Sequence, residues 1–202
     1  MPRKKTMHAE ERRNSILQAG LHIFTQKGYH GTSVREIAKE VGMNEALLYY
    51  YFPSKIDLVK AIVDMLTFEN IKFIQLAKAQ EDPVETLNVI GRQLIRYINE
   101  DDSFLRLSFS VLFVDDNEVK APLAGFFEQR TQELVTLLKP KLAVIDEEEL
   151  RMSIDAFFNG IFGYYIAKKY YQVSHLQQTD DNAYVSLLAE KLAAQFPPAR
   201  GR

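Results

Sequence analysis

The sequence contains no cysteine, so it cannot form disulfide bonds, a thiolate nucleophile or a zinc–thiolate site. Only 9 glycines and 7 prolines occur in 202 residues, and 47% of the residues are hydrophobic, which suits a compact helical protein. No apolar run approaches the roughly 18 residues that a membrane span needs, and no apolar segment follows the basic N-terminus. We therefore expect a cytoplasmic protein without a secretory signal or a membrane partner.

Motifs that would indicate an enzyme are also missing. The four histidines are scattered, and none has metal-ligand spacing to another histidine or to an acidic motif. Neither a glycine-rich phosphate loop nor a G-x-S-x-G motif is present. The acidic run at residues 146–149 has the pattern of a helix start, where carboxylates interact favourably with the helix dipole. The sequence therefore predicts a protein that is not an enzyme and uses no metal or cofactor.

The charge is unevenly distributed along the chain. The net charge is −2, but residues 1–60 hold ten basic and six acidic residues, whereas residues 61–202 hold fifteen and twenty-one. A positive segment attached to a negative one suits binding to phosphate groups through the first segment, although a solubilising basic tail gives the same count.

Residues 32–55 carry the most informative pattern in the chain. Ser33 and Glu36 form a capping box that predicts a short helix from residue 34, and Gly42 ends it in a tight turn. Asn44 is a favourable N-cap for a second short helix over residues 45–51, which Pro53 ends. Two short helices joined by a glycine turn are typical of the helix-turn-helix motif, although an ordinary corner between two helices has the same spacing.

The residue identities in this segment favour the first interpretation. The run LLYYYFPSK, preceded by a turn glycine and by GYHGTS, strongly resembles the N-terminal domain of the tetracycline-repressor (TetR) family over about residues 10–60. The residues that fall at the family's spacing are Gly28, Thr32, Ile37, Ala38, Gly42, Leu48, Tyr49, Phe52 and Lys55. For the rest of the chain the resemblance implies only the architecture.

We predict an all-α fold of about nine helices, because no β alternation or repeat is visible. Residues 1–54 are predicted to form a three-helix DNA-binding head containing the helix-turn-helix, and residues 55–202 a helical domain for ligand binding and dimerisation. The expected helices begin near residues 8, 34, 45, 55, 83, 103, 122, 147 and 181. Gly91 lies in the apolar stripe of the fifth helix, which indicates close contact with another helix.

The resemblance implies which residues contact DNA. These residues lie in the recognition helix and its tyrosine run, in the helix before it and at the start of the fourth helix. They are Arg35, Asn44, Glu45, Ala46, Leu47, Tyr49, Tyr50, Tyr51 and Lys55. Lys55 matches the family's phosphate-binding lysine. The alternative to a DNA contact for Tyr49 is a position in the hydrophobic core of the head. Leu47 departs from the family's small polar residue and loses that phosphate contact. Glu45 also departs from the family, and its carboxylate either accepts a hydrogen bond from cytosine N4 or points to solvent.

The basic arm of Arg3, Lys4 and Lys5 is either a solvated terminus or a contact to phosphate or the minor groove. The second half of the chain holds most of the phenylalanines, and apolar side chains usually line ligand pockets. The predicted ligand-binding residues are Phe68, Phe104, Phe109, Phe113, Phe126, Phe127, Phe158 and Phe162. Their alternative role is ordinary core packing.

Two glycines near the middle of the eighth helix, Gly160 and Gly163, indicate close approach of another helix, because glycine costs about 1 kcal/mol relative to alanine inside a helix. With Tyr184, Leu188 and Leu192 of the last helix they form the predicted dimer interface, as in the family. A helix pair buried within one chain would give the same pattern.

Together these features predict a homodimeric transcriptional regulator, a repressor that binds a near-palindromic double-stranded DNA operator. A small apolar or amphipathic effector is expected to release it. The alternatives are a helix-turn-helix protein whose C-terminal domain binds a protein partner, and an all-α carrier of apolar ligands that does not bind DNA.

Overall fold

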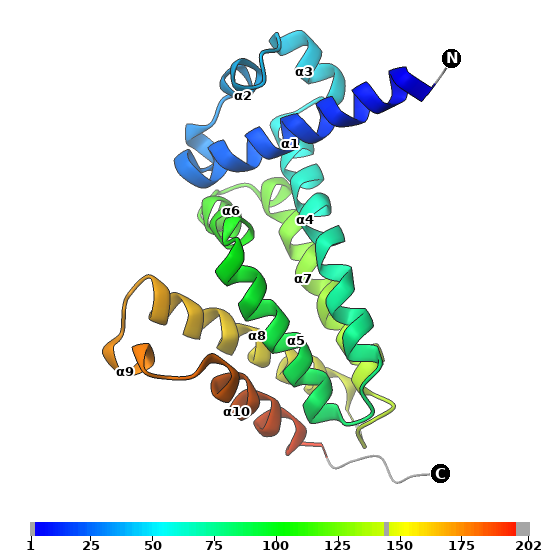
Figure 1. Ribbon diagram of the computed structural model, residues 1–202, viewed down its shortest axis with the longest axis vertical. Helices are drawn as coiled ribbons and strands as arrows, with labels where there is room; N and C mark the ends of the chain where they lie inside the picture. The colour runs from blue at the N-terminus through cyan, green and yellow to red at the C-terminus, as the bar shows by residue number, and fades with distance from the viewer. Residues whose placement is uncertain (1–2, 144–145, 197–202) are drawn as a thin grey trace. The chain divides into compact units, whose positions relative to one another are not determined.

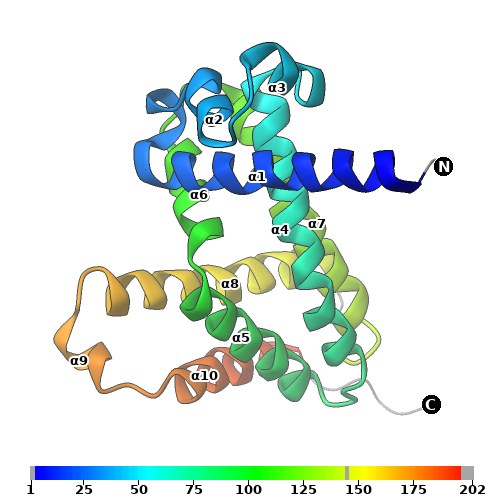
Figure 2. The same cartoon turned by 45° about the horizontal axis from the view of Figure 1, so that its top comes forward.

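The computed structural model describes residues 3–143 and 146–196, with the side chains of residues 3–8 and 67–72 left outside the description. This part of the chain is helical and contains no β-strand, which confirms the predicted all-α fold (Figures 1 and 2). The ten helices are α1 (Arg3–Gly31), α2 (Val34–Glu40), α3 (Glu45–Tyr51), α4 (Lys55–Lys78), α5 (Pro83–Glu100), α6 (Ser103–Leu112), α7 (Asn117–Leu138), α8 (Glu147–Lys169), α9 (Ser174–Gln177) and α10 (Asp181–Ala193). None of the described helices is long and apolar enough to cross a lipid bilayer.

The structure corrects three details of the prediction. The additional helix is α9, a single turn of four residues that has no apolar periodicity to reveal it. The first helix begins at Arg3, ahead of the predicted residue 8, and is interrupted at Gly28 with φ of 73°. The seventh begins at Asn117, because Asp116 Oδ1 accepts from the Glu118 backbone N–H at 2.9 Å, which places Pro122 in the second turn.

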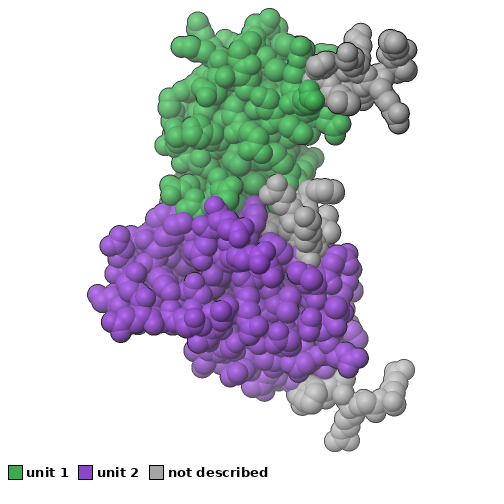
Figure 3. Space-filling view, viewed as in Figure 1, with its two compact units in different colours: residues 1–69, 101–126 green, residues 70–100, 127–202 purple. Residues whose placement is uncertain are grey.

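The chain divides into two compact units (Figure 3). The first comprises residues 1–69 and 101–126, and the second residues 70–100 and 127–202. The helices α4 and α7 therefore each contribute to both units. The functional boundary between residues 54 and 55 stays a prediction, since the units describe compactness and not activity.

In the first unit, α1 packs against α6 on one side and against α2 on the other (Figures 1 and 2). Leu17 and Phe24 of α1 are buried with Ile37 of α2 and Leu48 of α3. Gly20 brings α1 close to α4, since an added Cβ would lie 3.2 Å from the Leu58 and Ile62 side chains. This apolar centre fixes the positions of α2 and α3.

In the second unit, α5, α8 and α10 pack together around one hydrophobic core. A Cβ at Gly91 would lie 2.5 Å from Val185 of α10 and 3.1 Å from Phe157 of α8. Real side chains do not approach so closely, so only glycine permits this spacing. The predicted close contact at Gly91 is therefore confirmed.

Candidate nucleic-acid interface

The first helix of the motif, α2, is set by its termini as the sequence predicted. Ser33 is its N-cap, and the backbone N–H of Glu36 donates to Ser33 Oγ at 3.2 Å. Val41 closes the helix by donating to the Ile37 carbonyl, and Gly42 turns the chain with φ of 67°. A positive φ is inexpensive only for glycine, which explains this residue at the turn.

The second helix, α3, begins directly after the turn. The Asn44 side chain caps it, since Oδ1 accepts from the Leu47 backbone N–H at 2.8 Å. Leu48 is buried in the first unit, as is Phe52, the C-terminal cap residue. One face of α3 therefore packs against the core of the first unit, and the opposite face is exposed to solvent.

The exposed side of α3 consists largely of residues that the sequence assigned to DNA contacts. Asn44, Glu45 and Ala46 are exposed, and so are Tyr49 and Tyr50 at 45% and 81%. Leu47 and Tyr51 are half-buried. The exposure of Tyr49 corrects the alternative that this side chain belongs mainly to the core of the head. Because Asn44 Oδ1 is occupied by the cap, its side-chain NH₂ is the group left to donate to a base acceptor.

Arg35 and Glu45 come together across the motif, although they lie on different helices. Arg35 Nε is 3.6 Å from Glu45 Oε1, and the side chains are 86% and 48% exposed. The two terminal nitrogens of the guanidinium lie beyond this contact. The structure thus places Glu45 next to a cation, which neither of its predicted roles included.

Lys55 has a structural role that the sequence did not reveal. Its ammonium donates to the carbonyls of Tyr29 at 2.6 Å and Thr32 at 2.9 Å, and lies 4.0 Å from the centre of the Tyr29 ring. Partial burial lowers the pKa of the Lys55 ammonium. Two of its three donors are therefore occupied within the chain, where they hold the turn between α1 and α2. A contact to phosphate is left to the third donor.

Arg3, Lys4 and Lys5 lie in the first turn of α1, and their side chains fall outside the described residues, as does that of Phe68. The other predicted ligand-binding residues do not gather around one cavity. Phe104 and Phe126 pack together in the first unit with ring centroids 4.7 Å apart, whereas Phe109 and Phe113 of that unit are 42% and 89% exposed.

The remaining predicted ligand residues belong to the second unit. Phe127 is 41% exposed and meets the half-buried Phe162 edge to face, with centroids 6.4 Å apart. Phe158 is half-buried and contacts the core residue Phe157. The prediction of an aromatic pocket is corrected for the exposed residues, because apolar spacing identifies a helix face without showing what covers it.

Some of the residues predicted to form the dimer interface pack within one chain, whereas others are exposed. A Cβ at Gly160 would lie 2.9 Å from Leu188 Cδ1, so this glycine serves close packing of α8 against α10 within one chain. Leu192 is 2% exposed and belongs to the same core, which corrects its assignment to a subunit interface. Tyr184 is half-buried and stacks on Tyr164 with centroids 4.1 Å apart. Gly163 is exposed, and a Cβ there would meet nothing within 4 Å.

A polar cluster joins α8 to the start of α10. Lys168 Nζ and Tyr164 OH each donate to Asp181 Oδ1 at 2.6 Å, and Lys168 also donates to the Thr179 carbonyl at 2.7 Å. Burial raises the pKa of Asp181, but the hydrogen bonds from Lys168 and Tyr164 outweigh it and hold that pKa below its usual value. The same pairing raises the pKa of Lys168. The aspartate therefore stabilises the α8–α10 packing in its ionised form.

A capped two-helix motif with an exposed second helix is the arrangement found in helix-turn-helix DNA-binding proteins. Residues 16–62 match the family model described as "Bacterial regulatory proteins, tetR family". This segment is a helix-turn-helix DNA-binding domain of the TetR family of regulators.

Three similar proteins illustrate the range of the relatives. The nucleoid occlusion factor SlmA of Glaesserella parasuis is 25% identical over 169 residues, covering 80% of this chain and 83% of SlmA. The HTH-type transcriptional regulator AcrR of Shigella flexneri is 32% identical over 115 residues, covering 56% of this chain and 53% of AcrR. The solved structure of NalD, the secondary repressor of the MexAB-OprM multidrug efflux pump in Pseudomonas aeruginosa, superposes with a TM-score of 0.69 at 15% identity, covering 94% and 98% of the two chains.

Proposed function

We propose that this protein is a homodimeric transcriptional repressor that binds a near-palindromic DNA operator and is released by a small-molecule effector. The exposed side of α3 carries this proposal. It presents Asn44, Glu45, Ala46 and two tyrosine hydroxyls to the outside. Polar groups on a protruding helix of this kind suit base edges in the major groove, and the tyrosine hydroxyls suit the flanking phosphates.

Electrostatics of the head support the same function. Glu36 is paired with Lys27 and Glu45 with Arg35, so two acidic side chains of the motif are neutralised within the chain. The segment of residues 1–60 has an excess of basic residues. An excess of positive charge favours association with the phosphate backbone and makes the affinity depend on salt concentration.

The proposed subunit interface is the outer side of α8 and α10. Met152, Ala156, Asn159 and Gly163 follow one another at helical spacing on α8 and are all exposed, and Leu187 of α10 is 48% exposed. Small residues among apolar ones allow a partner helix to approach closely. Pairing of identical faces produces a two-fold dimer, which matches a palindromic site.

Repression and release by an effector are proposed partly by analogy. NalD is described as a repressor and AcrR as a transcriptional regulator. An effector that binds the DNA-free form more tightly must lower the affinity for DNA by the same factor.

The test is selection of bound duplexes from a random pool by the full chain, followed by titration of the selected site at several salt concentrations. We expect an inverted repeat and an affinity that falls steeply with salt. Ala46→Asp should abolish binding, because it places a carboxylate on the exposed side of α3 near phosphate. The control is Ala124→Asp, which introduces the same charge at an exposed alanine of α7.

Two results would contradict the proposal. One is selection of duplexes without a shared sequence, and the other is equal binding by the Ala46→Asp and control variants. If the protein sediments as a monomer at micromolar concentration, the proposal that it is a dimer is wrong. Melting curves of both variants establish that each remains folded.

A second candidate follows from the name of SlmA, which describes nucleoid occlusion. A protein of that kind fits the alternative in which the C-terminal domain serves a protein partner. Mapping of bound sites across the genome separates the two functions. Sites confined to a few promoters support a repressor, whereas many sites spread over one region of the chromosome support a nucleoid-associated role.

A further inference from the structure

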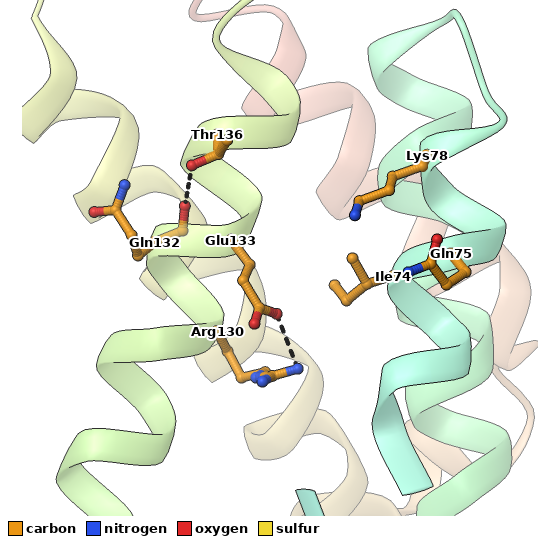
Figure 4. A pocket seen from close by; sticks show the side chains of 7 residues that line it. All are labelled: Ile74, Gln75, Lys78, Arg130, Gln132, Glu133 and Thr136. Carbon is orange, nitrogen blue, oxygen red and sulfur yellow. Dashed lines mark hydrogen bonds and ion pairs between the residues drawn. The ribbon is translucent and has the colours of Figure 1, made fainter. Parts of the chain in front are cut away.

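The second unit contains a cleft between the C-terminal half of α4 and the C-terminal half of α7 (Figure 4). Its volume is about 340 Å³, within the lower range of small-molecule sites. The side chains that line it are Ile74, Gln75 and Lys78 of α4 and Arg130, Gln132, Glu133 and Thr136 of α7. None of the phenylalanines predicted to bind ligand is among them.

The charges in this cleft are unequally compensated. Arg130 Nη1 lies 2.9 Å from Glu133 Oε2, and the two side chains are 12% and 32% exposed, so this pair neutralises itself in a largely buried position. Glu133 Oε1 also accepts from Gln129 Nε2 at 3.2 Å. The Glu133 carboxylate is therefore already paired with side chains of its own helix, α7.

Lys78 contributes the remaining charge. It has no hydrogen bond or ion pair with the described residues, and its ammonium points into the space between the helices, toward Ile74 (Figure 4). Neutral hydrogen-bonding groups come from Gln75, and from Thr136, whose hydroxyl proton is already donated to the Gln132 carbonyl at 2.9 Å. Thr136 thus offers an acceptor to a ligand. The site combines one uncompensated cation with a small apolar surface.

We propose that this cleft binds the effector, and that the effector is a small monoanionic amphiphile, a carboxylate with a short apolar body. The carboxylate pairs with the Lys78 ammonium, and the apolar body covers Ile74. Lys78 is exposed, so its ammonium reaches both water and the cleft. A dianion would leave one charge without a partner, and a fully apolar ligand would make no use of the ammonium. This inference rests on the proposed repressor function and names the chemistry of its ligand.

The two helices that line the cleft, α4 and α7, each continue into the first unit. The cleft residues Ile74, Gln75 and Lys78 lie on α4, the helix that begins with Lys55. At that beginning, Lys55 holds the turn that precedes α2. A ligand that favours one position of α4 therefore has a direct route to the recognition helices.

The experiment titrates the full chain, without DNA, with hexanoate and with hexanamide, its neutral analogue of the same shape, at constant ionic strength. Benzoate and benzamide form a second pair with a flat apolar body. We expect each carboxylate to bind saturably and about twofold to fivefold more tightly than its amide, the effect of an ion pair with an exposed ammonium. Absence of saturable binding by both carboxylates overturns the proposal.

Variants then locate the site. Lys78→Gln should remove the preference for carboxylate, Gln75→Glu should weaken binding, and Gln75→Lys should strengthen it, since position 75 is exposed and borders the cleft. Lys60→Gln is the matched control, because it removes the same charge from an exposed position on α4. Carboxylate binding that is equal in all four variants overturns the assignment to this cleft.

Addition of the bound carboxylate to the protein–operator complex tests the regulatory part. We expect lower affinity for the selected operator in the wild type and an unchanged affinity in Lys78→Gln. Operator binding that ignores a carboxylate bound in the cleft overturns its role as effector. Sequence-selective DNA binding without ligand is measured separately, so failure of the cleft leaves the repressor function standing.

Discussion

The ion pair between Arg35 and Glu45 leads to a prediction about base recognition. Arg35 Nε faces Glu45, so the two terminal nitrogens of the guanidinium are available for the bidentate contact that arginine makes with guanine O6 and N7. We predict that Arg35 contacts guanine and that Glu45 positions it. Glu45→Ala should then relax specificity at the same base pair as Arg35→Ala.

The structure sets the expected magnitudes. Both side chains are largely exposed and 3.6 Å apart, and exposed ion pairs contribute only about 0.2–1 kcal/mol to stability, so neither variant should unfold the head. A bidentate contact to a base discriminates by about 1–3 kcal/mol, and Arg35→Ala should lose that amount at one base pair per half-site. Glu45→Ala should lose a part of it, and the double variant should lose no more than Arg35→Ala.

The assay measures the affinities of the wild type, Arg35→Ala, Glu45→Ala and the double variant. Each is titrated with the selected DNA site and with its single-base variants at one salt concentration. Glu40→Ala is the control, because it removes a negative charge from an exposed residue at the end of α2. Uniformly tighter binding by both Glu45→Ala and Glu40→Ala, with specificity unchanged, would refute the positioning role. Losses that add fully in the double variant would mean that the two residues act independently.

The remaining predictions concern stability and assembly. Lys55→Ala should lower the free energy of unfolding by about 2–3 kcal/mol, since two carbonyls lose a charged donor, and an unchanged urea midpoint would contradict the observed hydrogen bonds. Gly160→Leu should destabilise the monomer fold by overpacking against Leu188, whereas Gly163→Leu should leave the helical content unchanged and weaken the dimer in sedimentation. Asp181→Asn should destabilise the protein by about 1–2 kcal/mol at pH 7. Because the pKa of the folded aspartate is lowered, this difference should begin to shrink as the pH falls below the usual aspartate pKa and should be lost once the pH falls through the lowered pKa of the folded state. A difference that persists below that pH would exclude the ionised form as its cause.

The helix-turn-helix was predictable because its signals are local. Ser33, Gly42 and Asn44 each act within four residues of their own position, and the structure places each of them in its predicted role. Gly91 was predictable for a related reason, since a glycine within an apolar stripe requires a close neighbour whatever that neighbour is.

The roles that sequence analysis missed depend on distant partners. Lys55 contacts main-chain carbonyls at residues 29 and 32, and carbonyl groups leave no pattern in a sequence. Gly160 and Gly163 look alike in the sequence, and as residues three apart they lie only about 60° from each other around α8. Only the packed structure shows that Leu188 covers one of them. The exposed Phe113 likewise differs from the buried Phe104 in its surroundings, not in its residue type.

The contact at Gly91 has a consequence for synthesis of the protein. Val185, which approaches Gly91 most closely, is 94 residues further along the chain. At about 5–20 residues per second, α5 leaves the ribosome roughly 5–20 s before α10 can cover it. During that interval the apolar side of α5, with Leu87 and Ile90, has no α10 to bury it. We therefore expect chaperones to bind the nascent chain at this helix, and we expect a chain truncated before α10 to aggregate more readily than the full chain.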